Sequence, residues 1–111
     1  MATETNEYRL DTETIADLKS TVEETDLNRA LGIFEALADE RRVTVLRLLG
    51  ETELCVCDLV EIFDIDYSNL SYHLKKMKEA DLVTADRDGN YVTYRATDRG
   101  ETVIEILQTL S

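Results

Sequence analysis

The stretch "ELCVCDLVEIFDIDYSNLSYHLKKMKEA", residues 53–80, contains two helical patterns separated by the short turn "FDID" at residues 63–66. Apolar residues at helical spacing give each pattern one inward face. These residues are Val56, Leu59, Val60 and Phe63 in the first pattern, and Leu70, Leu74 and Met77 in the second. Thr52 is expected to cap the first helix and Asp66 the second, because both side chains can accept a hydrogen bond from a free backbone N–H. Two helices joined by so short a turn predict a helix-turn-helix.

Helical periodicity continues on both sides of this stretch. It covers residues 12–25 and 27–50 before the stretch, where the pattern of residues 27–38 is expected to continue through residues 39–50 as one helix that Gly50 ends, and residues 99–111 after it. The recurring apolar residues are Ile15, Leu18 and Val22; Ala30, Leu31, Phe34 and Leu37; and Val43, Leu46 and Leu49. With no proline and only four glycines, the chain favours helices with short connections.

The hydrophobic period changes from helix to strand between residues 82 and 97. The segments "LVTADR" and "NYVTYRAT" alternate residue by residue around Asp88 and Gly89, and Asp-Gly between alternating strands is a strong hairpin signal. Asp98 and Glu101 are expected to form a capping box at the start of the final helix. This order of elements predicts a mainly α fold with a small β-hairpin wing, a winged helix-turn-helix.

The final helix is apolar over more than one stripe. It carries Val103, Ile104, Ile106, Leu107 and Leu110, more apolar surface than contact with one core requires. A helix of this kind is expected to be buried on two sides, and at a chain terminus the second side points to another subunit.

The length of 111 residues fits one domain with a modest core. We expect residues 1–26 to form an N-terminal helical extension and residues 27–111 to form the winged helix-turn-helix domain. The sequence has no run of about eighteen apolar residues, which argues against a membrane protein. The start "MATETNEYRL" lacks the basic flank and apolar stretch of a secretion signal. A cytoplasmic protein is therefore expected.

The net charge of −12 is unevenly distributed along the chain. Residues 1–66 carry 17 acidic and 6 basic side chains, whereas residues 67–99 carry 5 and 6, a net charge of +1. The second half of the helix-turn-helix thus lies in the one stretch that is not acidic. Acidity elsewhere suits a halophilic cytoplasm, because self-repulsion is screened within roughly 3 Å at 1 M salt. An ordinary acidic protein would have the same composition.

The second helix of the helix-turn-helix has a polar face opposite its apolar one. At 100° per residue this face, the predicted reading face, contains Ser68, Asn69, Ser71, Tyr72, Lys75 and Lys76. Hydroxyl and amide groups can bond to base edges, and lysines suit phosphates. The sequence therefore predicts a DNA-binding surface, with an ordinary solvated face as the alternative.

Three further basic or histidine positions bear on this surface. Arg87 and Arg95 flank the expected hairpin tip, where they fit contacts with DNA phosphates, although ion pairs with Asp86 or Asp88 compete. His73, the only histidine, lies at the margin of the reading face and is expected to be a packed or hydrogen-bonded residue rather than a metal ligand. There is no acid–base pair in a catalytic setting and no glycine-rich phosphate loop, so an enzyme is not expected.

Cys55 and Cys57 are the only cysteines. A reducing cytoplasm and a very small ring both argue against a disulfide between them. Thiolates select thiophilic ions, namely As(III), Sb(III), Cd(II) or Pb(II), with Zn(II) as a borderline ion. On one ideal helix the two side chains would lie about 200° apart, so holding one ion would require the turn to unwind. Redox sensing by the thiols and plain burial remain alternatives.

At this point the chain resembles the ArsR/SmtB family of winged-helix transcriptional repressors, over residues 28–107. The similarity lies in "LADERRVTVLRLL", in "ELCVCDL", which matches the metal box of arsenic and cadmium sensors, and in "YSNLSYHLKKMKEADLV". The resemblance implies a homodimer built on the first and last helices that binds a palindromic operator in double-stranded DNA. It also implies release from the operator when a ligand such as As(III) or Sb(III) binds Cys55 and Cys57, with no permanent cofactor.

The chain departs from that family in its thiol and histidine positions. The third thiol of many arsenic sensors is replaced by Val60, no N-terminal cysteine is present, and the last helix has no histidine. A tetrahedral zinc or cadmium site from one chain is therefore disfavoured. Two rival functions stay open: a DNA-binding regulator that responds to redox state or to no ligand, and a winged-helix protein-interaction module that does not bind DNA.

Overall fold

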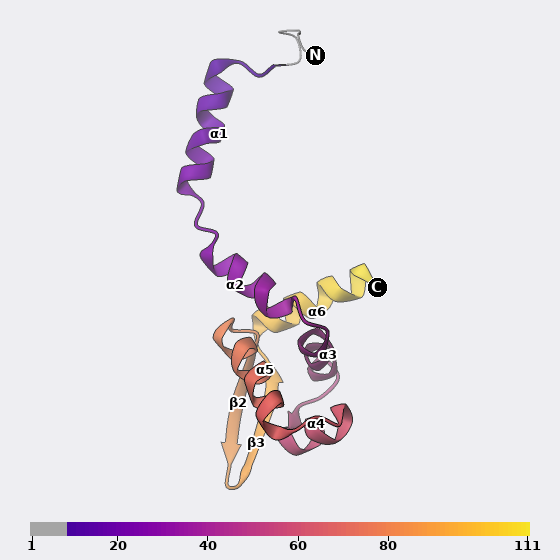
Figure 1. Cartoon of the computed structure of the whole chain (residues 1–111). Coiled ribbons are helices and arrows are strands. Elements are labelled where there is room, and N and C mark those ends of the chain that lie inside the picture. Colours follow the sequence, from indigo (N-terminus) through magenta and orange to yellow (C-terminus); the bar gives the residue numbers. More distant parts are fainter. Residues whose placement is uncertain (1–8) are drawn as a thin grey trace.

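A computed structural model describes residues 9–111 of the chain. Most of the segment from which the absence of a secretion signal was inferred, residues 1–8, lies outside the described residues. Along the chain the elements are α1 (Thr12–Glu24), α2 (Asn28–Leu37), α3 (Glu40–Leu49), β1 (Leu54–Cys55), α4 (Val56–Phe63), α5 (Tyr67–Glu79), β2 (Val83–Asp88), β3 (Tyr91–Ala96) and α6 (Asp98–Leu110). Figure 1 shows that α3, α4, α5 and α6 surround a core beside the β2–β3 hairpin, while α1 projects away from it. The predicted winged helix-turn-helix is confirmed.

The core lies between the helix-turn-helix, α3, α6 and the sheet. Leu46, Leu59, Leu70, Leu74, Met77 and Leu82 are at most 1% exposed. The inward faces predicted for α4 and α5 are therefore confirmed, because Leu59, Leu70, Leu74 and Met77 belong to this cluster and Val56, Val60 and Phe63 pack against it. Burying α4 and α5 in one core fixes the position of α5 relative to its neighbours. No helix within residues 9–111 has both the length and the apolarity that a membrane span needs.

Of the three helix caps predicted from the sequence, one is confirmed and two are wrong. Asp66 caps α5 by accepting a hydrogen bond from the Asn69 N–H at 2.8 Å, as predicted. The predicted cap at Thr52 is wrong, because residues 54–55 are extended and pair with β3, so that α4 begins only at Val56 with Cys55 as its N-cap. The final helix is capped by the Thr97 hydroxyl, which accepts from the Gly100 N–H at 3.0 Å, instead of by Asp98.

The sheet has three strands in the order β1-β3-β2, all antiparallel. The short strand β1 was not predicted, because two residues carry no readable period. Asp88 pairs with Tyr91, so the turn is Gly89-Asn90, one residue later than expected, and Gly89 has the positive φ of 64° that favours glycine. Because β1 directly precedes α4 and pairs with β3, the start of α4 is held next to the wing.

Gly100 allows α6 to pass close to the wing. A methyl group there would overlap the carbonyl oxygen of Leu82 and approach Ala96 Cβ to 3.2 Å. We expect Gly100→Ala to destabilise the fold by roughly 1–3 kcal/mol or more, because a backbone atom cannot move aside as a side chain can. The measurement is chemical denaturation at one fixed protein concentration.

Gly32, inside α2, provides the matched control for that substitution. A Cβ at Gly32 meets nothing within 4 Å. Gly32→Ala is expected to raise the free energy of unfolding by about 0.5–1 kcal/mol, because alanine is the better helix former. Equal effects of the two substitutions would contradict the close packing assigned to Gly100.

A large apolar surface is left uncovered on α1, α2 and α6. The described chain extends 66 × 26 × 23 Å with a radius of gyration of 20.5 Å, whereas a compact domain of this size has about 13 Å. α1 has no buried residue. The residues of this free apolar surface are Leu10, Ile15, Leu18, Val22, Leu27, Leu31, Phe34, Ile106 and Leu110.

Part of the inward face expected for residues 27–38 therefore points outward. Leu31 and Phe34 are 57% and 65% exposed, while Ala36 is buried and Ile33 packs against the core. The helix has two apolar stripes, and helical spacing alone does not tell which of them meets the core. On α6 the second apolar stripe predicted from the sequence is confirmed, since Val103 and Ile104 are buried and Ile106 is half exposed.

Candidate nucleic-acid interface and sulfur pair

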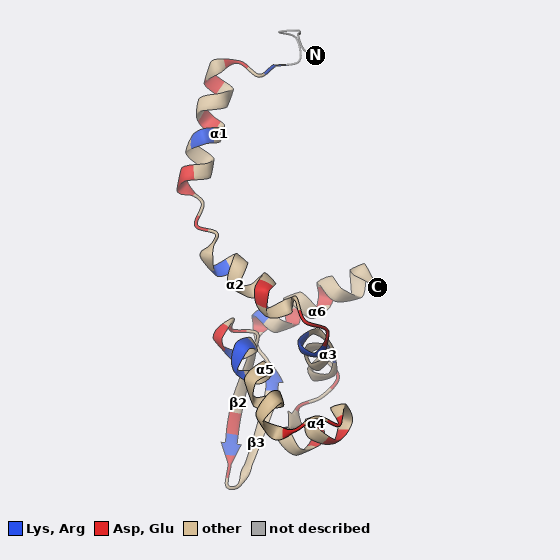
Figure 2. Cartoon of the chain, viewed as in Figure 1, with Lys and Arg blue, Asp and Glu red and all other residues tan. Residues whose placement is uncertain are grey.

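The predicted reading face lies on the outside of α5. Ser68, Asn69, Tyr72 and Lys75 are exposed, and Ser71 and Lys76 are partly buried. Leu70, Leu74 and Met77, on the opposite side of the helix, hold it against the core. Figure 2 shows acidic residues on α1, α2, α4, α6 and β2, and a group of basic residues in the C-terminal half of α5. The six side chains thus lie on the outer side of α5, within the one stretch of the sequence that is not acidic.

Tyr72 is supported by two cations. The Arg42 guanidinium carbon lies 5.8 Å from the centroid of the Tyr72 ring, and Lys76 Nζ lies 5.6 Å from it. Cations at this distance are attracted by an aromatic ring. The Tyr72 ring is 54% exposed, so these contacts restrain a side chain that otherwise extends into solvent. Sequence reasoning missed Arg42 as a neighbour of Tyr72, since the two residues lie on different helices.

Asn69 forms two hydrogen bonds with Asp66, the residue that caps α5. Its Nδ2 donates to Asp66 Oδ2 at 2.9 Å, while its backbone N–H donates to Asp66 Oδ1 at 2.8 Å. The amide oxygen of Asn69 accepts no hydrogen bond from the described residues. In this conformation Asn69 offers an acceptor to a ligand and holds the first turn of α5 in place.

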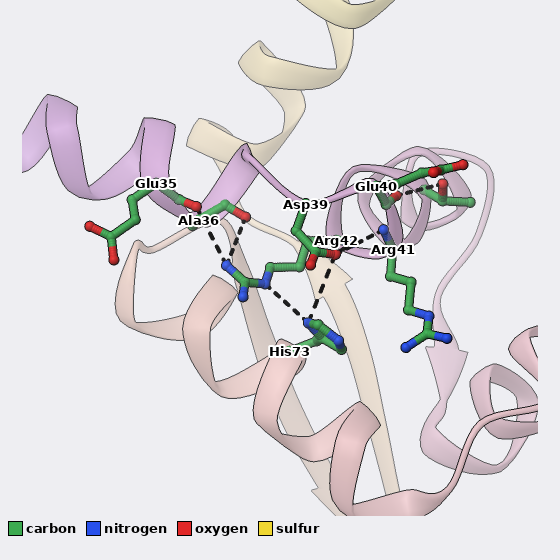
Figure 3. Close-up of polar contacts among 8 residues, drawn as sticks. Glu35, Ala36, Asp39, Glu40, Arg41, Arg42 and His73 are labelled. Carbon is green, nitrogen blue, oxygen red and sulfur yellow. Dashed lines mark hydrogen bonds and ion pairs between the residues drawn. The ribbon is translucent and has the colours of Figure 1, made fainter.

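His73 joins α5 to α2 and α3 through Arg42 (Figure 3). Arg42 Nε donates to His73 Nδ1 at 3.1 Å, and Arg42 Nη1 donates to the carbonyl oxygens of Ala36 and Glu35 at 3.3 and 3.5 Å. His73 is therefore hydrogen-bonded, as expected. Its Nδ1 also lies 4.0 Å from Asp39 Oδ1, but in the shorter contact with Arg42 this nitrogen is the hydrogen-bond acceptor.

Asp39 completes this connection at the start of α3. Its Oδ1 accepts from the N–H groups of Arg41 and Arg42 at 2.9 and 3.2 Å and so starts α3 as a new helix. The single helix expected over residues 27–50 is therefore wrong, because α2 ends at Leu37. Partial burial by itself raises the pKa of Asp39, but the Arg42 backbone N–H and the neighbouring His73 and Arg42 side chains outweigh it, so the pKa lies below its usual value. Asp39 is thus ionised near neutral pH, and its stabilising contribution is lost only as pH falls through this lowered pKa.

The two wing arginines differ in their surroundings. Arg95 pairs with Thr84 near the base of the hairpin, so its expected place at the tip is wrong, and its Nε lies 3.0 Å from Asp86 Oδ2. The competing ion pair foreseen from the sequence is therefore present. Arg87, opposite Val92 near the tip, is exposed and forms no ion pair within 4.0 Å among residues 9–111. Arg87 is the freer of the two for a phosphate.

Cys55 and Cys57 are joined by a disulfide, with their Cα atoms 5.3 Å apart. The expectation that no disulfide forms is therefore wrong, and so is the expected separation of about 200°. The physical reason is that Cys55 has extended backbone angles, φ −82° and ψ 164°, and only Cys57 lies within the helix. A strand-to-helix junction directs both sulfurs to the same side.

The sulfur of Cys55 is also part of the α4 cap. It accepts a hydrogen bond from the Asp58 N–H at 3.2 Å, and Asp58 Oδ2 accepts from the Cys55 N–H at 3.0 Å, forming a capping box. The ligand atoms of Cys55, Cys57 and Asp58 all lie within 4.8 Å of one another. After reduction this donor set, two soft sulfurs and one carboxylate, fits a thiophilic ion. The sequence had not indicated Asp58 as a member of the group.

Comparison with known proteins agrees with this arrangement. Residues 39–85, from the cap of α3 into β2, match the bacterial regulatory protein, arsR family. The chain is 42% identical over 66 residues to the arsenical resistance operon repressor of Bacillus subtilis, covering 59% of this chain and 63% of that protein. It is 38% identical over 84 residues to a putative arsenical resistance operon repressor ArsR of Halobacterium salinarum, covering 73% and 64%.

The solved structure of HlyU from Vibrio cholerae extends the similarity to the whole winged helix. It superposes with a TM-score of 0.71 at 30% identity, covering 78% of this chain and 96% of HlyU. The chain spans slightly less than two thirds of the two arsenical resistance repressors. The order of the helices, the presence of the wing and the sequence match from α3 into β2 all point to the same family. The chain belongs to the arsR family of regulatory proteins.

Proposed function

We propose that the protein is a transcriptional repressor that binds a specific site in double-stranded DNA. The observation that carries the proposal is the reading face of α5, which is exposed, polar and cationic on an otherwise acidic chain. In a helix-turn-helix the N-terminal part of the second helix enters the major groove, which is where Ser68, Asn69 and Tyr72 lie. Lys75, Lys76 and Arg87 would contact phosphates, and Arg95 would do so after leaving Asp86. We further propose that the protein acts in the cytoplasm, where its DNA target would lie, and that it is not an enzyme.

The repressor is proposed to act as a homodimer on a palindromic operator. Residues 1–26 would be a dimerisation extension and residues 27–111 the DNA-binding domain. The free apolar surface supports this assembly, because apolar residues exposed over three helices are expected to be covered by a partner. A second copy brings the same surface, and two reading faces would then meet two half-sites.

We expect Phe34→Glu and Ile106→Glu each to convert the dimer to a monomer, since a charge in an apolar interface costs about 2 kcal/mol or more in each subunit. Sedimentation at several concentrations measures the mass. Ile62→Glu is the control, because Ile62 is 53% exposed on α4, outside the free apolar surface. A wild-type monomer, or dimers of both variants, would refute the proposed interface.

The proposed inducer is As(III) or Sb(III) bound by the reduced Cys55 and Cys57 thiolates. The arsenical resistance repressors named above support this choice, and two thiolates with one carboxylate suit a three-coordinate ion. Cd(II), Pb(II) and Zn(II) are weaker candidates because a single chain offers only two sulfurs. No permanent cofactor is required.

The cysteine pair and the reading face are connected through the packing of α4 against α5. An ion held by Cys55, Cys57 and Asp58 would compete for the Asp58 carboxylate, which accepts the Cys55 N–H at 3.0 Å, and would thereby weaken the cap of α4. α4 shares the buried Leu59, Leu70 and Leu74 cluster with α5. A shift of α4 therefore moves the reading face, and with it the spacing of the two half-sites in the dimer.

The DNA-binding proposal is tested by measuring affinity for a fragment from the protein's own promoter, and for a scrambled fragment, from low salt to molar KCl. We expect a preference for the promoter that persists at molar salt, because the acidic surface is proposed to be an adaptation to a salt-rich cytoplasm. Equal affinity for both fragments at every salt concentration would favour a protein-interaction module instead.

A further inference from the structure

The structure contains the oxidised form of the proposed inducer site. Both sulfurs that would hold the ion are bonded to each other, and within residues 9–111 no other cysteine is available. A disulfide has no thiolate to offer, so the oxidised chain cannot bind As(III) or Sb(III) in the proposed way. The question is whether oxidation also disturbs the surface that would meet DNA.

The helix-turn-helix is complete in this oxidised form. Cys55 Sγ still accepts the Asp58 N–H at 3.2 Å, so the α4 cap does not require a free thiol. β1 still pairs with β3, through Leu54 with Tyr94 and Cys55 with Thr93. Leu59 and Leu70 are fully buried, and Ser68 and Tyr72 are exposed on α5. The disulfide and a formed reading face therefore coexist.

We propose that the Cys55–Cys57 disulfide is a redox lock on the inducer site, which keeps the repressor on its operator and makes it insensitive to the ion. This inference rests on the proposed function and concerns the regulation of the same site. It differs from redox sensing in the usual sense, because oxidation here does not release DNA but blocks release. The repressor would respond to a thiophilic ion only in a reducing cell.

The lock closes and opens by thiol–disulfide exchange with a small disulfide or dithiol. In closing, the two protein thiols pass two electrons and two protons to a small disulfide, which leaves as two thiols while the Cys55–Cys57 bond forms. In opening, a thiolate of a dithiol attacks one sulfur, a mixed disulfide forms, and the second thiol of the reagent displaces the protein thiol. Cys57 is exposed and Cys55 is partly buried, so Cys57 is the sulfur open to attack.

The test uses full-length protein in two states, reduced with a dithiol or oxidised with diamide, with each reagent removed by gel filtration because dithiols themselves bind arsenite. Thiol titration confirms the states. Promoter binding is then measured by mobility shift with and without sodium arsenite. We expect the same affinity for both states without arsenite, and release of the reduced state only. Loss of DNA binding on oxidation alone, or arsenite release of the oxidised state, would overturn the lock.

Two further measurements separate this inference from the proposed function. Equilibrium dialysis should show one arsenic per reduced chain and none per oxidised chain, whether or not DNA is present. If the reduced state binds arsenic but stays on DNA, the proposed induction fails while the lock on the site stands. Reduction of the oxidised chain with a dithiol, which is then removed, should restore binding of one arsenic per chain. An oxidised chain that stays unable to bind arsenic after reduction would overturn the lock.

Discussion

Arsenite is expected to weaken promoter binding of the reduced protein about 5- to 150-fold, which corresponds to the usual coupling of ~1–3 kcal/mol between two sites. The ion would draw the Asp58 carboxylate away from the Cys55 N–H and so disturb the start of α4 beneath the reading face. Cys55→Ser should remain bound at arsenite concentrations that release the wild type. The measurement is a mobility-shift titration in molar KCl.

Cys55→Ser is a suitable variant because it removes only the thiol chemistry. A serine oxygen can accept the same backbone N–H, and serine is among the preferred N-cap residues. The variant is therefore expected to fold and to bind the promoter with wild-type affinity without arsenite. Release of wild type and variant by the same arsenite concentration would show that the sulfur pair is not the inducer site.

Tyr72→Ala is expected to reduce the specific affinity by roughly 1–3 kcal/mol for each half-site, about 5- to 150-fold, while scrambled DNA is affected little. The side chain lies at the centre of the reading face and is held by Arg42 and Lys76. Tyr72→Phe keeps the ring and its contacts with the two cations, so it isolates the hydroxyl group. Fluorescence anisotropy on promoter and scrambled fragments measures both effects.

Lys75→Gln tests the phosphate part of the same surface. It should weaken binding to promoter and scrambled DNA alike, and it should reduce the slope of log affinity against log salt by about one for each phosphate that is no longer neutralised. Lys19→Gln, which makes the same charge change on α1, is the control. If Lys19→Gln and Lys75→Gln had equal effects, net charge and not the reading face would govern the affinity.

The regular parts of the fold could be predicted because they follow from short-range periodicity. Leu70, Leu74 and Met77 determine which side of α5 is buried, and therefore which side is left for DNA. The alternation around Gly89 placed the wing within one residue of its observed turn. Residues of β1 could not be assigned, because a two-residue strand exists only through its pairing with β3, which lies far along the chain.

The cysteine pair shows the same limit at the candidate site. The sequence predicted the position of the two cysteines and their affinity for thiophilic ions. The direction in which their sulfurs point depended on whether Cys55 was helical or extended. Pairing of Cys55 with Thr93 holds it extended, and this brings its sulfur to Cys57 and Asp58. The link from Arg42 to His73 and Tyr72 likewise joins residues that are distant in the sequence.

The sequence by itself determined the order of the elements, the inward face of α5 and the chemistry available at positions 55 and 57, since each depends on neighbours within one or two turns. Only the tertiary structure decided which apolar stripe of α2 meets the core, where α4 begins and that the two sulfurs face each other. Those features depend on contacts between distant segments, because burial and strand pairing are properties of the folded chain and not of any local stretch.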